Sequence, residues 1–241
     1  MLREVSERHG VAVLSETTIG RVLADLKKRG ILHSAKKLRL SAKTGKLLEK
    51  TVANKVKLRR NGYVPHDPGD LLQVDTVATF VNGIKRYTMN AVDLTSRFAF
   101  SYSYSSGSSL NAKDFYQKLQ YVAPFAIKRV QTDNGSEFMA HFREYLEAET
   151  VTQFFNYPRK PQYQGWIERF NRTIQEEFLD YRKETLAYDL PQFNQECMEY
   201  LVWYNSMRVH HSLGTPRQRL TPLAYLFPHG KSQEGWTHTH T

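Results

Sequence analysis

Three acidic residues of this 241-residue chain have the types and spacing for metal-dependent phosphodiester chemistry. Asp75 lies inside one strand-like run, Asp133 follows a second, and Glu168 lies on an expected helix. Two strands of one sheet and a packed helix can bring three carboxylates close together. Such a cluster repels itself unless divalent cations compensate its charge. Oxygen ligands favour Mg²⁺ or Mn²⁺, and two ions about 3.5–4 Å apart would activate the attacking oxygen and stabilise the leaving oxygen.

Each carboxylate also has a plain structural interpretation when it is considered alone. Asp75 would be a solvent-facing strand residue, because burial of an unpaired carboxylate costs several kcal/mol. Asp133 belongs to an Asp-Asn-Gly run, which is ordinary turn chemistry. Glu168 would be a solvated charge at the edge of a helix. Only the three together indicate a catalytic metal site, so we assign Asp75, Asp133 and Glu168 as a set.

The elements that must position these residues are predicted from hydrophobic periodicity and turn signals. Three β-rich runs indicate an antiparallel meander, after which helices alternate with strands. This order predicts a mixed α/β sheet with helices on its faces. The expected strands are 71–79, 86–93, 98–104, 127–132 and 152–157, and the expected helices are 111–122, 136–149, 164–182 and 190–207.

All of the excess positive charge lies in the first quarter of the chain. Residues 1–62 contain 16 Lys or Arg against 5 Asp or Glu, whereas residues 63–241 contain 18 against 19. Clustered cations suit phosphate binding, because each neutralised phosphate releases condensed counterions. A solvated basic linker is an equally good interpretation of the charge alone.

Residues 2–32 are expected to form two short helices, with Ser15 as the N-cap of the second. The spacing is similar to a helix-turn-helix, whose second helix enters the major groove of DNA. Because the segment begins abruptly, the module is a candidate for truncation at its N-terminus. The residues expected on the buried face are Ile19, Val22, Leu23 and Leu26, and those expected to meet bases or phosphates are Thr17, Arg21 and Lys28.

Longer motifs around the three carboxylates resemble those of retroviral-type integrases and insertion-sequence transposases with a D-D-E catalytic core. The similar segments are Val-Asp-Leu-Thr-Ser-Arg (92–97), Gln-Thr-Asp-Asn-Gly-Ser-Glu-Phe (131–138), Gln-Gly-Trp-Ile-Glu-Arg-Phe-Asn-Arg-Thr (164–173), Trp-Tyr-Asn-Ser-Met-Arg-Val-His-His-Ser-Leu-Gly (203–214) and Thr221-Pro222. The resemblance covers about residues 62–227. It implies a ribonuclease H-like fold with helices on both faces of the sheet, preceded here by the small helix-turn-helix-like segment.

The chain departs from this family in two ways. There are 34 residues between Asp133 and Glu168, one fewer than in many members. The His/Cys zinc domain of retroviral integrases is absent from the sequence, and the helix-turn-helix-like segment stands in its place. The second departure indicates a bacterial insertion-sequence transposase rather than a retroviral enzyme.

The resemblance implies a transposase or integrase that cleaves one DNA strand and joins the freed 3′-hydroxyl to target DNA. Asp75, Asp133 and Glu168 would hold two Mg²⁺ or Mn²⁺ ions. The partners would be double-stranded DNA, at the element ends and the target, and further copies of the chain in a homo-oligomer. Two alternatives stay open: a ribonuclease H-like nuclease without joining activity, and a catalytically retired regulator that only binds DNA.

The expected domains are a DNA-binding segment (1–34), a basic linker (35–62), the catalytic core with C-terminal helices (63–227) and a tail (228–241). Further DNA contacts are expected from Arg159 and Lys160, before the catalytic helix, and from Arg172, one turn after Glu168. Their alternatives are solvated charges, or for Arg172 an ion pair with Glu176. No run approaches the roughly 18 apolar residues that span a bilayer, and no signal-peptide pattern is present. We therefore expect a cytoplasmic bacterial protein without membrane contact.

Other titratable residues are expected to have structural roles. Asp93 ends the second strand and would form an ion pair with Arg97. Glu137 would lie in the first turn of a helix, where the helix dipole favours a negative charge. Cys197, the single cysteine of the chain, would fill a small space in the core.

Overall fold

The computed structural model describes residues 16–29, 31, 38–40, 47–49, 57–59, 63–156 and 165–228. The chain divides into two compact units, Met1–Lys55 and Val56–Thr241, and each is described by itself. Within the described part of the chain, no helix has the length and apolar character needed to cross a bilayer.

The N-terminal unit contains one described helix, α2 (Glu16–Lys28), which begins directly after Ser15 as predicted. Thr17, Arg21 and Lys28 are exposed on it. The expected buried face is wrong in part, because Val22 and Leu23 are 48% and 40% exposed. The first expected helix lies outside the described residues, so the helix-turn-helix stays a prediction.

Two short strands lie in the stretch that was expected to be a basic linker. Strands β1 (Leu38–Leu40) and β2 (Leu47–Glu49) pair in antiparallel register, with Leu38 opposite Glu49 and Leu40 opposite Leu47. Each strand contains two leucines, which gives the pair more apolar character than its surroundings. These six residues therefore form regular structure where none was predicted.

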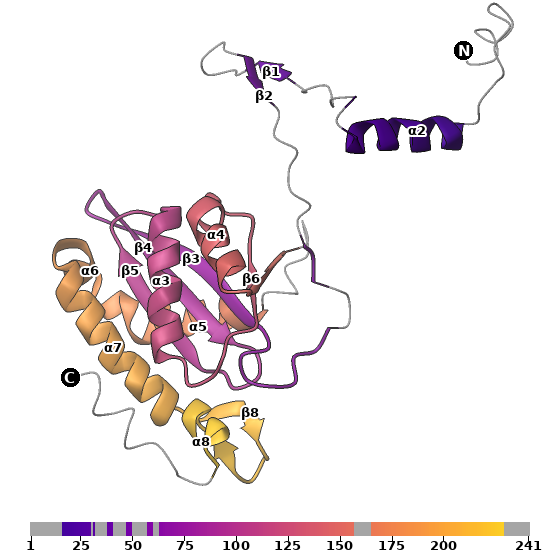
Figure 1. Ribbon diagram of the computed structural model, residues 1–241. Coiled ribbons are helices and arrows are strands. Elements are labelled where there is room, and N and C mark those ends of the chain that lie inside the picture. Colours follow the sequence, from indigo (N-terminus) through magenta and orange to yellow (C-terminus); the bar gives the residue numbers. More distant parts are fainter. Residues whose placement is uncertain are drawn as a thin grey trace, which may run out of the picture. The chain divides into compact units, whose positions relative to one another are not determined.

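The second unit is built on a five-stranded mixed sheet with the strand order β5-β4-β3-β6-β7 (Figure 1). The first three strands form an antiparallel meander, and β6 and β7 join it in parallel. Asn82 and Gly83, both at positive φ, make the tight turn between β3 and β4. The predicted succession of strands along the chain, the antiparallel meander and the mixed sheet are confirmed. The strands are β3 (Leu72–Val81), β4 (Ile84–Asp93), β5 (Ala99–Tyr104), β6 (Arg129–Thr132) and β7 (Thr152–Phe155).

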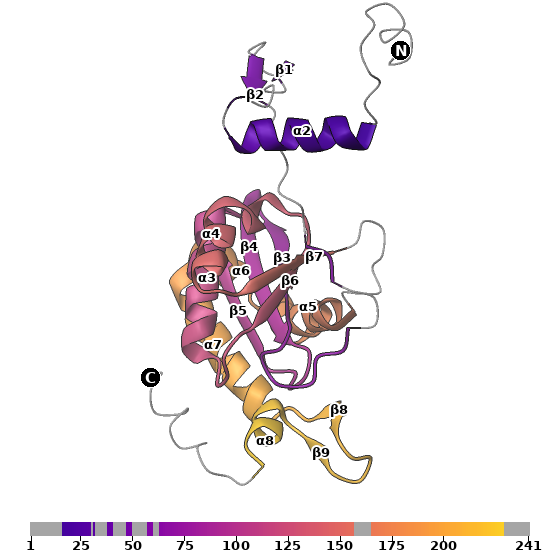
Figure 2. The same ribbon diagram turned by 45° about the vertical axis from the view of Figure 1, so that its right-hand side comes forward.

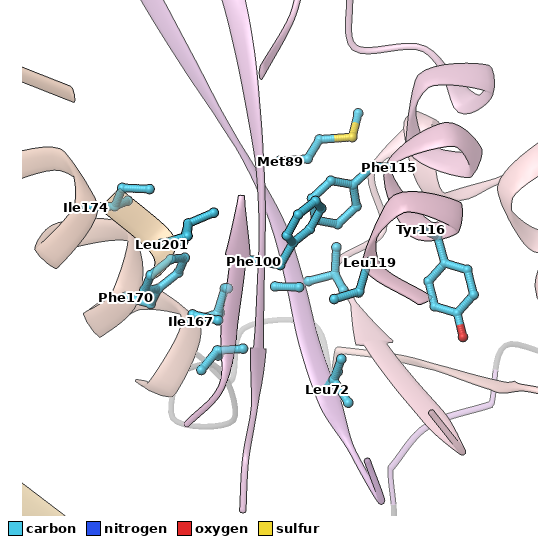
Figure 3. Close-up of a cluster of buried hydrophobic side chains, with 14 of the residues drawn as sticks. Leu72, Met89, Phe100, Phe115, Tyr116, Leu119, Ile167, Phe170, Ile174 and Leu201 are labelled. Atoms are coloured by element: carbon cyan, nitrogen blue, oxygen red, sulfur yellow. The ribbon is translucent and has the colours of Figure 1, made fainter. Parts of the chain in front are cut away.

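Helices cover both faces of this sheet (Figure 2). Figure 3 shows apolar side chains on both sides of the strands. Phe115 and Leu119 of α3 (Ser109–Val122) lie on one side, and Ile167 and Phe170 of α5 (Gly165–Glu177) lie on the other. All four are buried. The helices are α3 (Ser109–Val122), α4 (Ala140–Ala148), α5 (Gly165–Glu177), α6 (Lys183–Tyr188), α7 (Leu190–Ser206) and α8 (Pro222–Leu226), with 3₁₀ turns η1 (Ser136–Phe138) and η3 (Leu179–Tyr181).

Helix α7 closes the edge of the sheet at β5. The side chain of Asn194 bonds to both the N–H and the carbonyl of Ser103, and Asn205 does the same at Ala99. An uncovered edge strand is a template for pairing with another chain, so these amides satisfy backbone groups that would otherwise be open. The short hairpin of β8 (His210–Gly214) and β9 (Arg219–Leu220) then follows α7 along the chain.

Asp93 is structural, but the expected ion pair with Arg97 is wrong. The buried carboxylate of Asp93 accepts hydrogen bonds from the N–H groups of Gly69, Thr95 and Ser96 and from the Ser96 hydroxyl. Arg97 donates instead to the Leu94 carbonyl and to the Ser212 hydroxyl, 3.0 Å away. The turn that follows Asp93 supplies enough donors to hold the carboxylate without a cation.

Gly69 lies in a position where only glycine fits. Its φ is +82°, and a Cβ built there would lie 2.1 Å from the carbonyl oxygen of Ala126. We expect Gly69→Ala to lower the free energy of unfolding by about 3 kcal/mol or more. The matched control is Gly83→Ala, with φ +81° and open space around it, which should cost about 1 kcal/mol from backbone strain alone. Equal losses in urea unfolding would show that the Ala126 contact relaxes freely.

Asp70 is expected to make the fold sensitive to acid. Its carboxylate accepts from Lys128 Nζ at 2.7 Å and from the N–H groups of Asp67 and His66, and these contacts, Lys128 first, lower the pKa of Asp70 to about 2. Because the unfolded pKa is higher, about 3.9, ionised Asp70 stabilises the fold above pH 4 and loses this effect as pH falls through about 2.

The test compares wild type with Asp70→Asn by urea unfolding between pH 4 and pH 2. Wild type should lose more stability over this interval than the variant. Asp67→Asn is the control, because its exposed carboxylate lies 3.9 Å from the same ammonium group and such contacts contribute little. Parallel curves for wild type and Asp70→Asn would contradict the assignment.

Candidate active site

Asp75 lies on β3, and Asp133 directly follows the adjacent strand β6. Gln73 of β3 pairs with Gln131 of the parallel strand β6, and each aspartate follows two residues later. Residues two apart along a strand point to the same face, so Asp75 lies on the same face as Gln73, which α5 covers, and Asp133 directly follows the end of β6. The charge of Asp133 acts on Asp75 and contributes to a raised Asp75 pKa. The expected meeting of these two residues is therefore found.

The carboxylate of Asp75 is half-buried and only partly compensated. One oxygen accepts from the N–H of Thr76 at 2.9 Å and the other from the side-chain amide of Asn171 at 2.8 Å. Burial raises the pKa of Asp75; these two hydrogen bonds oppose that shift, and repulsion from Asp133 and Glu137 adds to it. A half-buried carboxylate with other carboxylates nearby is a place that a cation would stabilise.

A line of polar side chains crosses the sheet to reach Asp75. The Ser101 hydroxyl donates to Asn90 at 2.6 Å, Asn90 donates to Asn171 at 2.8 Å, and Asn171 donates to Asp75. Only this direction places an amide N–H, rather than a carbonyl oxygen, against the carboxylate. This chain of hydrogen bonds was not predicted from the sequence. The sequence feature that points to it is the position of Asn90 opposite Asp75 in the expected β-hairpin.

Glu168 lies on α5, one turn before Asn171, and its side chain is exposed. The start of this helix is anchored to the sheet, because the N–H of Ile167 donates to the buried side-chain oxygen of Gln73 at 3.0 Å. Within the described residues, no three His, Cys, Asp or Glu side chains are arranged to hold a metal ion. The structure thus brings Asp75 and Asp133 together and leaves Glu168 outside ligand geometry.

Glu137 is a further carboxylate of this site, and its expected place in the first turn of a helix is confirmed, the helix being the short 3₁₀ helix η1. It lies in the 3₁₀ turn η1, whereas α4 begins only at Ala140. A Cβ built on Gly135 would be 2.6 Å from a Glu137 oxygen and 2.9 Å from an Asp133 oxygen. The absence of a side chain at Gly135 therefore lets these two carboxylates approach one another.

The other predicted DNA contacts are distributed over both units. Arg172 is exposed on α5, and no ion pair joins it to Glu176, although both residues are described. Arg159 and Lys160 lie outside the described residues. Thr17, Arg21 and Lys28 are exposed on α2 in the N-terminal unit.

Comparison with known proteins identifies the family. Residues 65–161 and 149–222 match two models that are both described as an integrase core domain. The chain belongs to the integrase core domain family. It is also 28% identical, over 200 residues, to the ORF3 protein of Spiroplasma virus SpV1-C74, which is named as an integrase. That alignment covers 73% of this chain and 54% of the relative, so the chain spans about half of the relative's length.

Solved structures of retroviral integrases share the fold. A chain of the simian T-cell lymphotropic virus intasome, in complex with PP2A regulatory subunit B56 gamma, matches with a TM-score of 0.54 at 16% identity, covering 71% of this chain and 60% of that one. The HTLV-2 integrase catalytic core domain, in complex with magnesium, matches with a TM-score of 0.50 at 18% identity, covering 66% of this chain and 96% of that one. These likenesses confirm the predicted ribonuclease H-like fold.

Proposed function

We propose that this integrase core protein is a transposase or integrase that cleaves a DNA strand and transfers it to a second DNA, using divalent cations. The observation that carries the proposal is the pair Asp75, on β3, and Asp133, directly after the adjacent strand β6, whose negative charges repel each other and are only partly compensated by hydrogen bonds. A protein that only binds DNA gains nothing from such a pair, because clustered carboxylates repel both each other and phosphate.

Asp75 and Asp133 are the proposed holders of Mg²⁺ or Mn²⁺, since their oxygens suit hard cations and a cation would relieve their repulsion. Glu168 is the proposed third ligand, and its exposed side chain has to turn toward the pair. When bound, two ions would supply activation of the attacking oxygen and stabilisation of the leaving oxygen. Asn171 would orient the Asp75 carboxylate, and Gln73 would hold the start of the helix that carries Glu168.

The proposed substrates are double-stranded element ends and target DNA, bound by a homo-oligomer. The N-terminal basic unit would supply contacts through Thr17, Arg21 and Lys28, and the core through Arg172, with Arg159 and Lys160 before α5. Among the similar structures, HTLV-2 integrase is described in dimeric and trimeric forms and the simian virus protein in an intasome. This supports, for the present chain, the proposal of an oligomer on DNA.

The deciding experiment is a strand-joining assay with labelled duplexes that carry the DNA flanking the gene of this protein. Incubation with Mg²⁺ or Mn²⁺ and a plasmid target should give nicked ends and then labelled plasmid. Nicked ends without joined product would indicate a nuclease. Binding of the duplex without any cleavage, with either metal, would indicate a DNA-binding regulator and contradict the proposal.

A further inference from the structure

A basic cleft lies next to the carboxylates in the second unit. Its volume is about 820 Å³, and it is formed by the segment before β3, the turn between β4 and β5, and the start of α5. The described residues that line it include no Asp or Glu. Its basic members are Arg59, His66, Arg97 and Arg169.

Two of these arginines share one aromatic ring. The guanidinium carbon of Arg97 lies 3.4 Å from the centre of the Trp166 ring, and that of Arg169 lies 5.4 Å from it. Burial lowers the pKa of Arg97, the charge of Asp93 opposes this shift, and the charge of Arg169 adds to it. Two like charges thus contact the same aromatic ring through cation–π interactions.

Among the described residues, donors of both arginines stay unused, one nitrogen of Arg97 and the whole guanidinium group of Arg169. Arg97 is fixed by the Leu94 carbonyl and by Ser212, through Nη1 and Nε, which leaves its Nη2 free of any acceptor among the described residues. Arg169 is exposed, and it has neither a hydrogen-bond acceptor nor an ion-pair partner in the described part of the chain. Arginines with a purely structural role normally use their donors on carboxylates or carbonyls, so the unused donors of Arg169 and the unused Nη2 of Arg97 indicate an anionic ligand.

The cleft opens beside the candidate active site. Gln73 lines it and lies two residues before Asp75 on the same face of β3, so the two side chains are about 7 Å apart along the strand. Arg169 directly follows Glu168 on α5. Arg59 is held at the cleft by the side chain of Gln131 at 3.3 Å and by the carbonyl of Tyr63 at 2.5 Å.

We propose that this cleft binds the phosphodiester backbone of DNA next to the cleavage site, independently of the N-terminal basic unit. The choice of DNA as the ligand rests on the proposed function. Residues 63–241 hold 18 basic against 19 acidic residues, so net charge does not attract DNA to the core. A cleft that gathers arginine side chains and has no carboxylate in its described lining would attract DNA locally, because guanidinium groups match phosphate oxygens in geometry and charge.

The test measures duplex binding by fluorescence anisotropy, with the full chain and in EDTA, so that no cleavage occurs. Arg169→Gln is compared with Lys113→Gln, which removes the same charge from α3, where Lys113 lies over the Tyr145 ring on the opposite side of the sheet. Arg169→Gln should weaken binding several-fold and reduce the slope of log affinity against log salt by about 0.9, the value for one neutralised phosphate. Lys113→Gln should leave the slope unchanged.

Equal slopes for wild type and Arg169→Gln, or equal reductions in Arg169→Gln and Lys113→Gln, would overturn the proposal. Since Arg169 is exposed, its replacement should not unfold the protein, and thermal unfolding checks this. The outcome is distinct from that of the strand-joining assay. A reduced slope in a protein that never cleaves DNA would support DNA binding by the cleft and reject the proposed enzymatic function. Cleavage with an unchanged slope would support the enzymatic function and reject DNA binding by the cleft.

Discussion

Asp75→Asn and Asp133→Asn should each abolish strand cleavage and joining while leaving DNA affinity within a few-fold of wild type. Both carboxylates are proposed metal ligands, and an amide cannot replace the charge that holds the ions. Changes in groups that merely support metal ligands already cost about 10- to 100-fold, so loss of a ligand should exceed about 100-fold in cleavage rate. Single-turnover cleavage at saturating DNA, with anisotropy for affinity, measures the two effects separately.

Glu168 and Glu137 form a matched pair that tests which carboxylate completes the site. We assign Glu168 as the third ligand, so Glu168→Gln should lose cleavage as severely as the aspartate variants. Glu137→Gln should retain cleavage, although its carboxylate lies near Asp133 in the structure. The opposite pattern would replace Glu168 with Glu137 as the third ligand. Substantial cleavage by both aspartate variants would reject the metal site altogether.

Removal of residues 1–55 should eliminate most of the salt-sensitive DNA binding. This segment carries 13 Lys or Arg against 5 Asp or Glu, the largest charge imbalance in the chain. The slope of log affinity against log salt should flatten by about 0.9 for every phosphate that the shortened protein no longer neutralises. The deletion ends at residue 55 because the N–H of Phe155 in β7 bonds to the Lys57 carbonyl, which ties the next residues to the core.

The control for the deletion is the core itself. The shortened chain should keep its cooperative unfolding, because Met1–Lys55 forms a separate compact unit. A residual slope should also persist, supplied by the cleft around Arg97 and Arg169. A slope equal to that of the full chain would place all of the electrostatic binding in the core and contradict the proposed role of the N-terminal unit.

The strands of the core were predictable because they are long and regular in pattern. The β3–β4–β5 meander shows clear β-rich runs with short turns, and all three strands lie within a few residues of their expected positions. The expected helix 136–149 is instead divided into η1 and α4, since Ala140 has positive φ and the Ser109 hydroxyl bonds to the backbone of Met139 and Phe142. That division depends on a residue of α3, which local periodicity does not reveal.

Short elements held by distant partners were not predicted. Helix α6 has six residues, and the last carbonyls of this helix, at Leu186 and Ala187, accept hydrogen bonds from Arg86 of β4. Its stability thus depends on a strand about a hundred positions earlier in the chain. The β8–β9 hairpin was missed for a similar reason, because its two pairs of facing residues carry little β-pattern.

The candidate site was predictable at the level of motifs but not of side-chain contacts. The positions of Asp75 within a strand and of Asp133 after a strand follow from the sequence, and the parallel register of β3 and β6, which pairs Gln73 with Gln131, brings these two segments together. The contact between Asn171 and Asp75 needs the packing of α5 on the sheet, and the place of Glu137 needs the turn at Gly135. Both depend on tertiary geometry, which a single sequence pattern does not contain.

The most direct test of the central claim is a crystal structure of the protein in Mn²⁺, with the ion located by its anomalous scattering. We predict a peak in contact with carboxylate oxygens of Asp75 and Asp133, with Glu168 turned inward to join them. Mn²⁺ bound elsewhere, or between Asp133 and Glu137 with Glu168 still directed to solvent, would contradict the assignment.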